Sequence, residues 1–562
     1  MLVILDDGPR RVFSEPLAVI TADTTDQVPA ALEAVQTALD KGHHVAGWLG
    51  YELGYVLEPR LARPQVPGPL LRLGVFGPPS GEAPPAVGRA YAGPLRPEWD
   101  ASDYESRFAR VKDYIAAGDI YQANLSFRAS FPFLGNPRTL YEHLRAASGA
   151  AHCAYVDVYT EEGGARILSL SPELFFDLAG DGRITVRPMK GTFARKGDDE
   201  AERTALAASA KDRAENLMIV DLLRNDLSRI AEPGSVEVSD MFKVETYPTL
   251  HAMVSTVTAR KRADAGVADI LRALFPCGSV TGAPKIRAME ILRELEASPR
   301  GAYCGAIGVF GPDGSARFNV AIRTLTVSGG QGELGIGGGV VQDSSAASEY
   351  AECLLKARFF EAGRKPLELI ETLCWQNQFV RLDSHLGRME NSALMFGLAF
   401  DRDVAQAALE KAVAGKQGPL RVRLILNEVG DHVASAHDLP ANPSHWTYAV
   451  SPETTHSSDV FLRHKTSWRE LHEREAKRLG TDEVIFVNER GELTEGARSN
   501  IFIARDGLLL TPPLDAGLLD GRLRAELIAQ GKAREAKLTP DDLTGEVYFG
   551  NSLRGLIAAK PA

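Results

Sequence analysis

The chain of 562 residues has few cysteines and no long apolar run. Its cysteines are far apart and form no CxxC pair, so we expect neither a disulfide framework nor a zinc site, and we predict that all are buried thiols. No apolar stretch reaches the roughly 20 residues that cross a bilayer, and residues 1–7 are too short and too acidic for a signal peptide. A cytoplasmic protein without a membrane partner is therefore predicted.

The chain also lacks an excess of positive charge. It has 63 basic and 74 acidic residues, a net charge of −11 that is spread without long runs. This balance argues against nucleic acid or an anionic membrane as a partner. It leaves room for local basic pockets that bind a small anion.

The length predicts two to four domains, and the pattern of elements predicts an α+β fold. Amphipathic helices such as 104–117 and 283–295 alternate with short strands such as 184–188 and 303–310. Residues 61–97 are rich in proline and glycine, which predicts an irregular excursion or lobe junction. A helix ending near Phe360 runs into glycine and proline before a new strand pattern at 367–373. We therefore predict domains at 1–362 and 367–562.

Carboxylates recur at helical spacing in two segments. Glu349, Glu352 and Lys356 fall at i, i+3 and i+7 of one expected helix, and Asp212 and Glu215 share a face of another. A set of oxygen donors suits Mg²⁺, which is held by one or two carboxylates with waters and substrate oxygens. Faces of this kind are more often solvated surface, so the spacing alone leaves both interpretations open.

The first domain contains four motifs in a fixed order: Ser171-Pro172-Glu173-Leu174-Phe175, Pro188-Met189-Lys190-Gly191-Thr192, the run Lys211 to Asp226, and Glu349 to Lys356 after the triple glycine 337–339. This order of motifs resembles the chorismate-utilising enzymes. The resemblance implies a layered α/β sandwich and favours Mg²⁺ as a cofactor. Lysine at 190, where anthranilate synthases have alanine, resembles the 4-amino-4-deoxychorismate synthase branch.

The resemblance also implies roles for single residues. Glu173 matches the general acid that protonates the leaving hydroxyl at C4, and Lys190 matches the nucleophile that attacks C2 before ammonia adds at C4. A free lysine with a pKa near 10.4 is almost entirely ammonium at pH 7, so a dry pocket or a nearby cation must lower that value. His251 matches an active-site histidine, with a buried core histidine as the alternative. Gln122 stands where isochorismate-forming relatives have a lysine base for water.

The implied substrate carries two carboxylates, which basic side chains and backbone N–H groups bind. Arg323 matches the position that binds the enolpyruvyl carboxylate, with Tyr303 and Lys356 nearby. Backbone N–H groups at glycine-rich turns can contact the substrate closely; the candidates are Gly191, Thr192, Gly282, Gly338 and Gly339. Each of these taken alone is more often an ordinary turn or surface residue.

No cysteine lies in a Gly-x-Cys-x-Gly nucleophile turn, so we expect no glutaminase in this chain. The resemblance implies that a separate glutamine amidotransferase subunit supplies the ammonia.

The second domain resembles fold-type IV pyridoxal-phosphate enzymes, aminodeoxychorismate lyases among them. The motifs are Phe461 to Thr466, Leu493 to Phe502, Thr511-Pro512-Pro513 and Gly517 to Gly521. This implies two small α/β lobes and possible dimerisation. A pyridoxal-phosphate site needs a lysine for the aldehyde, an acid for the ring nitrogen and an anion cup for phosphate. Lys465 and Glu495 match the first two; the third is predicted at Arg388, Ser499, Asn500, Asn551 and Ser552.

Together the two domains predict amination of chorismate followed by elimination of pyruvate to give 4-aminobenzoate for folate synthesis. The alternative within enzymes is an anthranilate-type synthase fused to a branched-chain or D-amino-acid aminotransferase-like domain. A catalytically inactive scaffold that binds the amidotransferase is a third hypothesis, which the intact Glu173, Glu215, Glu352, Lys190 and Lys465 disfavour.

Overall fold

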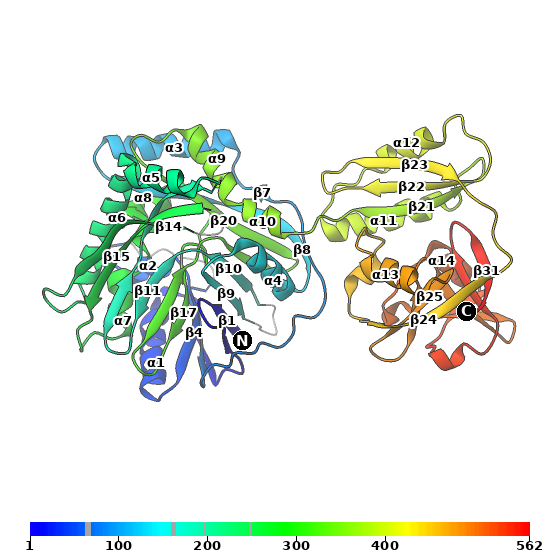
Figure 1. Ribbon diagram of the computed structural model, residues 1–562, viewed down its shortest axis with the longest axis horizontal. Coiled ribbons are helices and arrows are strands. Elements are labelled where there is room, and N and C mark those ends of the chain that lie inside the picture. The colour runs from blue at the N-terminus through cyan, green and yellow to red at the C-terminus, as the bar shows by residue number, and fades with distance from the viewer. Residues whose placement is uncertain (62–68, 159–163, 196, 247–249) are drawn as a thin grey trace. The chain divides into compact units, whose positions relative to one another are not determined.

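The computed structural model describes residues 1–61, 69–158, 164–195, 197–246 and 250–562, and the chain forms two compact units (Figure 1). The first comprises Met1–Ala86, Leu95–Phe131 and Pro137–Arg364, and the second comprises Val87–Pro94, Pro132–Asn136 and Lys365–Ala562. The second unit thus takes two short segments from the first half of the sequence. No helix in the described ranges has the length and apolarity needed to cross a membrane.

The first unit is built on two large sheets. The strands of one sheet follow the order β16 (Gly282–Ala283), β8 (Gln122–Gly135), β20 (Gln331–Val340), β19 (Thr324–Ser328), β10 (Arg166–Ser171), β9 (His152–Asp157), β1 (Leu2–Asp6) and β2 (Arg11–Phe13), with β7 (Arg96–Pro97) beside β8. Those of the other follow β13 (Met189–Ala194), β15 (Leu250–Arg260), β12 (Arg183–Val186), β11 (Leu174–Leu178), β18 (Ala316–Val320), β17 (Ala306–Phe310), β4 (His44–Leu49), β5 (Leu71–Phe76) and β3 (Ala18–Ala22), with β14 (Glu237–Thr246) beside β15.

Apolar side chains from both sheets form one core. Val3 and Leu5 of β1 pack with Ala46 and Trp48 of β4 and with Ile307 of β17, because alternate residues of each strand point into the space between the sheets. The layered sandwich predicted for the first domain is confirmed.

Ten helices of the described ranges pack against the two sheets or against one another. They are α1 (Val28–Asp40), α2 (Leu53–Leu57), α3 (Ala101–Ala116), α4 (Pro137–Ser148), α5 (Asp199–Ala208), α6 (Ala210–Ser228), α7 (Val267–Leu274), α8 (Lys285–Leu295), α9 (Ala346–Lys356) and α10 (Arg358–Gly363). Helices α1, α6 and α7 pack on the second sheet in the largest apolar cluster, and α3 lies beside α9 (Figure 1).

The second unit has two smaller sheets. The first consists of β21 (Leu369–Trp375), β22 (Leu420–Leu426) and β23 (His432–Asp438). The other has the order β26 (Leu493–Gly496), β25 (Glu483–Asn488), β24 (Trp446–Thr455), β31 (Gly555–Pro561), β30 (Val547–Asn551), β27 (Asn500–Arg505), β28 (Leu508–Thr511) and β29 (Ala533–Glu535). The helices are α11 (Leu382–Phe396), α12 (Arg402–Val413), α13 (Glu470–Leu479) and α14 (Arg522–Ala529).

The proline- and glycine-rich stretch is more ordered than its composition predicts. Residues 62–68 lie outside the described ranges, but β5 pairs with β3 and β4 in the sandwich. Strand β6 (Ala90–Ala92) pairs with the end of β8 in the second unit, where the buried Tyr91 ring packs edge-on against Phe396. The prediction of an irregular excursion is therefore wrong for both strands. All five cysteines are free and buried, as predicted.

Candidate active sites

Glu173 and Lys190 form an acid and amine pair in the first unit. Glu173 follows β10, is buried, and accepts a hydrogen bond of 2.7 Å from Ser279 Oγ. Burial raises the pKa of Glu173, while Ser279 and the charge of Lys190 act in the opposite direction. Burial lowers the pKa of Lys190 on β13, with Glu173 opposing and Lys356 adding to the effect. The carboxyl is thus biased toward its protonated form and the amine toward its neutral form, which suits an acid and a nucleophile.

Gln122 lies beside this pair at the start of β8. It is buried, and within the described ranges neither its amide oxygen nor its amide nitrogen has a hydrogen-bond partner. A Cβ added at Gly339 would lie 2.8 Å from Gln122 Nε2 and 3.7 Å from Lys190 Nζ. A Cβ at Gly282, whose φ is +146°, would lie 2.3 Å from the Gln122 carbonyl oxygen. The backbone thus approaches the two polar side chains at positions where a larger residue would not fit.

Helix α9 brings its acidic and basic side chains to the glycines of β20. Ser344 Oγ donates to the buried Glu349 at 2.7 Å, and Lys356 Nζ lies 3.0 Å from Glu352 and donates to the Gly337 carbonyl at 3.2 Å. A Cβ at Gly338 would be 3.3 Å from Glu349 Oε2 and 3.7 Å from Lys356 Nζ. Glu349, Glu352 and Lys356 therefore lie on one face of α9, which is directed toward the candidate site. About half of the Glu352 side chain remains exposed.

Helix α6 supplies Asp212 and Glu215. A Cβ at Gly191, where φ is +86°, would meet Asp212 Cβ at 2.8 Å. Burial raises the pKa of Glu215; Lys190 opposes this, and Glu349 adds to it. Among the described residues, the carboxylate oxygens of Asp212, Glu215, Glu349 and Glu352 do not gather within 4.8 Å of one another. The two helices place acidic groups around Lys190, and the Mg²⁺ prediction stays a prediction.

His251 lies on β15, opposite Phe193 of β13. Its side chain is fully buried, and its Nδ1 is 3.0 Å from Thr246 Oγ1. Its Nε2 is 3.4 Å from Asp199 and 3.3 Å from Glu202 of α5. The sequence predicted the histidine but neither of these carboxylates.

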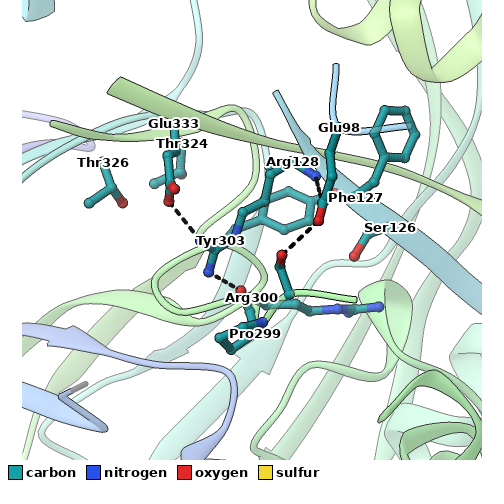
Figure 2. A pocket seen from close by; sticks show the side chains of 12 residues that line it. Glu98, Ser126, Phe127, Arg128, Pro299, Arg300, Tyr303, Thr324, Thr326 and Glu333 are labelled. Atoms are coloured by element: carbon teal, nitrogen blue, oxygen red, sulfur yellow. Dashed lines mark hydrogen bonds and ion pairs between the residues drawn. The ribbon is translucent and has the colours of Figure 1, made fainter. Parts of the chain in front are cut away.

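Arg323 and Tyr303 are the other predicted carboxylate-binding residues. Arg323 is half-buried, has a φ of +50°, and has its pKa lowered by burial. A non-glycine residue in the left-handed region is uncommon and often marks a functional position. Figure 2 shows Tyr303 in a small cavity with Arg300 and Thr324, and a Cβ at Gly335 would clash with its ring. The backbone of Thr192 lies in β13, but its side chain is outside the described part.

In the second unit, burial shifts the pKa values of both Lys465 and Glu495. Burial lowers the pKa of Lys465 to about 8, with Glu371 opposing and Arg388 adding to the effect. Burial raises the pKa of Glu495 to about 7, with Arg469 opposing. The Leu519 N–H donates to Glu495 at 3.2 Å. A positively charged N–H group that donates to Glu495 would offset the free-energy cost of burying the carboxylate. The protonated pyridine nitrogen of pyridoxal phosphate is such a group.

Arg388 is held by a carboxylate that the sequence did not reveal. Its Nε and Nη2 donate to Glu371 at 2.8 and 2.7 Å, and its Nη1 donates to the Asp520 carbonyl at 2.8 Å. Glu371 also pairs with His385 Nδ1 at 2.6 Å, and His385 Nε2 lies 2.8 Å from Ser552 Oγ. A guanidinium has five N–H donors, so two remain for an anion.

The remaining predicted cup residues lie on adjacent strand ends. Asn551 Nδ2 donates to Ser499 Oγ at 3.0 Å, and Asn500 Nδ2 donates to the Leu519 carbonyl at 3.0 Å. Leu519 in turn contacts Glu495. The predicted side chains thus form three hydrogen-bonded groups: Arg388 with Ser552 through Glu371 and His385, Glu495 with Asn500 through the Leu519 backbone, and Ser499 with Asn551. Lys465 interacts electrostatically with Glu371, Arg388 and Glu495.

Four side chains that contact the candidate site residues were missed from the sequence. Ser279 lies three residues before the predicted Gly282, but its approach to Glu173 depends on a contact between distant segments. Glu371 stands in the apolar strand pattern 367–373, and an acidic residue at a buried strand position was a usable signal. For Asp199 and Glu202, the sequence indicated only a helix that begins with acidic residues, and not a contact with His251.

Comparisons with known proteins match the two halves of the chain to different families. Residues 80–362 match the chorismate binding enzymes, and residues 368–560 match the class IV amino-transferases. Aminodeoxychorismate synthase component 1 of Klebsiella aerogenes is 45% identical over 273 residues, 48% of this chain and 59% of that protein. Anthranilate synthase component 1 of Streptomyces coelicolor is 41% identical over 46% of this chain and 52% of that protein.

The chain spans a little over half the length of the curated relatives that it matches first. Among solved structures, anthranilate synthase component I from Streptococcus pneumoniae has a TM-score of 0.54 at 24% identity, over 65% of this chain and 92% of that one. This likeness supports the fold of the first unit.

Proposed function

The chain belongs to the chorismate binding enzyme family, and from this premise we propose that it makes 4-aminobenzoate in two steps. The first unit aminates chorismate at C4 to give 4-amino-4-deoxychorismate. The second unit then eliminates pyruvate from that product. The match to class IV amino-transferases at 368–560 supports the second step, since both reactions begin with an amino group that pyridoxal phosphate can bind.

The observation that carries the first step is the pairing of Lys190 with Glu173. Burial raises the pKa of Glu173 and lowers the pKa of Lys190, which favours a protonated carboxyl beside a neutral amine. Glu173 protonates the C4 hydroxyl while Lys190 Nζ bonds to C2, the ring double bonds shift, and water leaves C4. Ammonia then bonds to C4, and the reverse shift expels Lys190 Nζ from C2. The addition of Lys190 with loss of water and the addition of ammonia with loss of Lys190 follow the same stereochemical course in opposite directions. The configuration at C4 is therefore retained.

The substrate carboxylates are assigned to two regions. Arg323 binds the enolpyruvyl carboxylate, because its guanidinium is half-buried and an anion would offset the cost of that burial. Mg²⁺ fits the acidic side chains of α6 and α9, all of them oxygen donors, with Glu215 and Glu352 as the main ligands and Asp212 and Glu349 beside them. There it would neutralise the ring carboxylate. Gln122 and the glycines of β13, β16 and β20 line the ring.

The second step is assigned to the Lys465 network. Pyridoxal phosphate, when bound, supplies an electron sink for the carbon that carries the amine. Lys465 Nζ would hold the cofactor and, once the substrate amine has released it, could take the proton from C4 of the ring and pass it to the departing pyruvate, for which its pKa of about 8 is suited. Glu495 would pair with the ring nitrogen. Arg388, Ser552 and the strand ends at Ser499, Asn500 and Asn551 would bind the phosphate.

Two partners belong to the proposal. Ammonia comes from a separate glutamine amidotransferase, and the name component 1 of the relatives supports the existence of a second component. Two copies of the chain associate through the second unit.

Product analysis tests the function directly. The purified chain is incubated with chorismate, ammonium, Mg²⁺ and pyridoxal phosphate, and the products are separated by chromatography. Formation of 4-aminobenzoate and pyruvate supports the proposal. Anthranilate as the main product would favour the alternative of an anthranilate-type synthase fused to an aminotransferase-like domain.

A further inference from the structure

His251 and two carboxylates of α5 form a compact group of possible ligand atoms. Asp199 and Glu202 lie in the first turn of α5, and the buried His251 faces them from β15. The three ligand atoms lie within 4.8 Å of one another. The group is built by segments that the sequence separates by about fifty residues.

The orientation of His251 is that of a metal ligand. Its ring is fully buried, and Nδ1 is paired with Thr246 Oγ1 at 3.0 Å. Within the described residues, Nε2 has no hydrogen-bond partner and points at the two carboxylates. In metal sites a histidine commonly donates one ring N–H to a neighbouring oxygen, which leaves the other nitrogen unprotonated for the ion.

The distances fit a small tetrahedral ion. Nε2 lies 3.4 Å from Asp199 Oδ1 and 3.3 Å from Glu202 Oε2. Zn²⁺ has bonds of about 2.0–2.2 Å to nitrogen and carboxylate oxygen, so neighbouring ligand atoms of a tetrahedron are separated by roughly 3.3–3.5 Å. Both separations are close to that edge length, and three protein ligands leave a fourth position open.

The donor set selects the class of ion. An imidazole nitrogen with two carboxylates suits Zn²⁺ and similar divalent transition ions, whereas Mg²⁺ takes oxygen ligands and retains its waters. Arg195 pairs with both oxygens of Asp199 at 2.7 Å, so the ion shares Asp199 with one nearby cation. The buried nitrogen of His251 is therefore the central ligand of the site, with the two carboxylates beside it.

We propose that Asp199, Glu202 and His251 bind a divalent ion of the Zn²⁺ class, and that this ion inhibits the chorismate half by occupying Nε2 of His251. Phe193, which pairs with His251, is three residues from Lys190 along β13, so the site borders the proposed reaction centre without containing its nucleophile. The inhibition rests on the proposed function. The binding does not.

Binding is measured on the full chain with Zn²⁺ by isothermal titration calorimetry, in a non-chelating buffer with excess Mg²⁺. The variants are Glu202→Gln, Asp199→Asn, and the matched control Glu200→Gln, an exposed residue of the same helix. We expect at least a tenfold weaker Zn²⁺ affinity in Glu202→Gln, a smaller loss in Asp199→Asn and no change in Glu200→Gln. Circular dichroism verifies that each variant is folded. Equal affinity in Glu202→Gln and Glu200→Gln would overturn the site.

Inhibition is measured as chorismate consumption against Zn²⁺ concentration. Wild type and Glu200→Gln should lose activity at the Zn²⁺ concentrations that saturate the site, and Glu202→Gln should stay active at least tenfold higher. Inhibition that persists in Glu202→Gln after binding is lost would refute the inhibitory role. If no variant consumes chorismate, the proposed function fails, while the calorimetric result still decides the metal site.

Discussion

Glu371 accepts two parallel hydrogen bonds from Arg388, at 2.8 and 2.7 Å, inside the second unit. Burial alone would raise the pKa of Glu371, but the charge of Arg388 and the bond with His385 hold it well below its ordinary value. A buried carboxylate thus fixes the guanidinium and the imidazole that reach toward Asp520 and Ser552. The proposed phosphate cup therefore depends on an acidic residue that is not one of its proposed phosphate-binding groups.

We expect Glu371→Gln to destabilise the second unit by about 3–5 kcal/mol, because it leaves the Arg388 charge buried with a neutral partner. Urea unfolding followed by tryptophan fluorescence measures the change. Glu390→Gln is the control, since Glu390 pairs with Arg402 in an exposed bridge of 3.6 Å that contributes less than about 1 kcal/mol. A similar small effect in both variants would contradict the role given to Glu371.

The same pair predicts a pH dependence of stability. Because the pKa of Glu371 is lowered in the folded chain, its stabilisation is complete above the ordinary carboxyl pKa and is lost as the pH falls toward the folded value. The difference in unfolding free energy between wild type and Glu371→Gln should therefore shrink below about pH 4.5. A difference that is constant from pH 7 to pH 3 would be inconsistent with an ionised Glu371.

Ser279→Ala tests the general acid. The Ser279 hydrogen bond lowers the pKa of Glu173, so its removal should raise that pKa further. The limb of the kcat/KM profile for chorismate that belongs to Glu173 should move to higher pH, and the limb that belongs to Lys190 should move less. A uniform loss of rate with an unchanged profile would assign Ser279 a structural role only.

Lys190→Ala should abolish formation of 4-amino-4-deoxychorismate, because no amine remains to attack C2. Ammonia can then reach the C2 face, so slow formation of anthranilate is expected. Chromatography of the products with ammonium as the nitrogen source separates the two compounds. Wild-type rates of the 4-amino product would exclude the covalent route.

Glu352→Gln should abolish amination of chorismate while the pyridoxal-phosphate absorption of the second unit is retained. Removal of one ligand charge weakens Mg²⁺ binding and leaves the ring carboxylate facing uncompensated acids. Glu361→Gln on α10 is the control, since Glu361 is exposed and pairs with Arg364. Unchanged turnover of Glu352→Gln would end the assignment of Glu352 as a metal ligand.

Much of the fold could be predicted because hydrophobic periodicity marks helices and strands, while their ends depend on contacts. The helix expected at 283–295 begins at Lys285, because Gly282 and Ala283 pair with β8 before Pro284. The strand expected at 303–310 begins at Ala306, since Cys304 has a φ of +59° in a turn. The dense prolines and glycines of 61–97 concealed β5, whose residues 71–76 are nearly all buried.

The residues of the candidate sites also fall into two classes, those that a local motif indicates and those that depend on tertiary contacts. Residues within motifs, such as Glu173, Lys190, Lys465 and Glu495, could be proposed from the sequence because the chemistry expected of them requires particular residue types. Ser279, Asp199, Glu202 and Glu371 could not, because each reaches its candidate site through a contact with a distant segment that one sequence does not encode locally.

The central claim, that two independent sites act in sequence, is tested most directly by the products of Lys465→Ala. This variant lacks the amine that holds the cofactor and moves the ring proton, but it leaves the Lys190 site untouched. With chorismate, ammonium and Mg²⁺ it should consume chorismate at the wild-type rate, accumulate 4-amino-4-deoxychorismate and release no pyruvate. Release of pyruvate at the normal rate would contradict the assignment of the second unit and, with it, the two-step account.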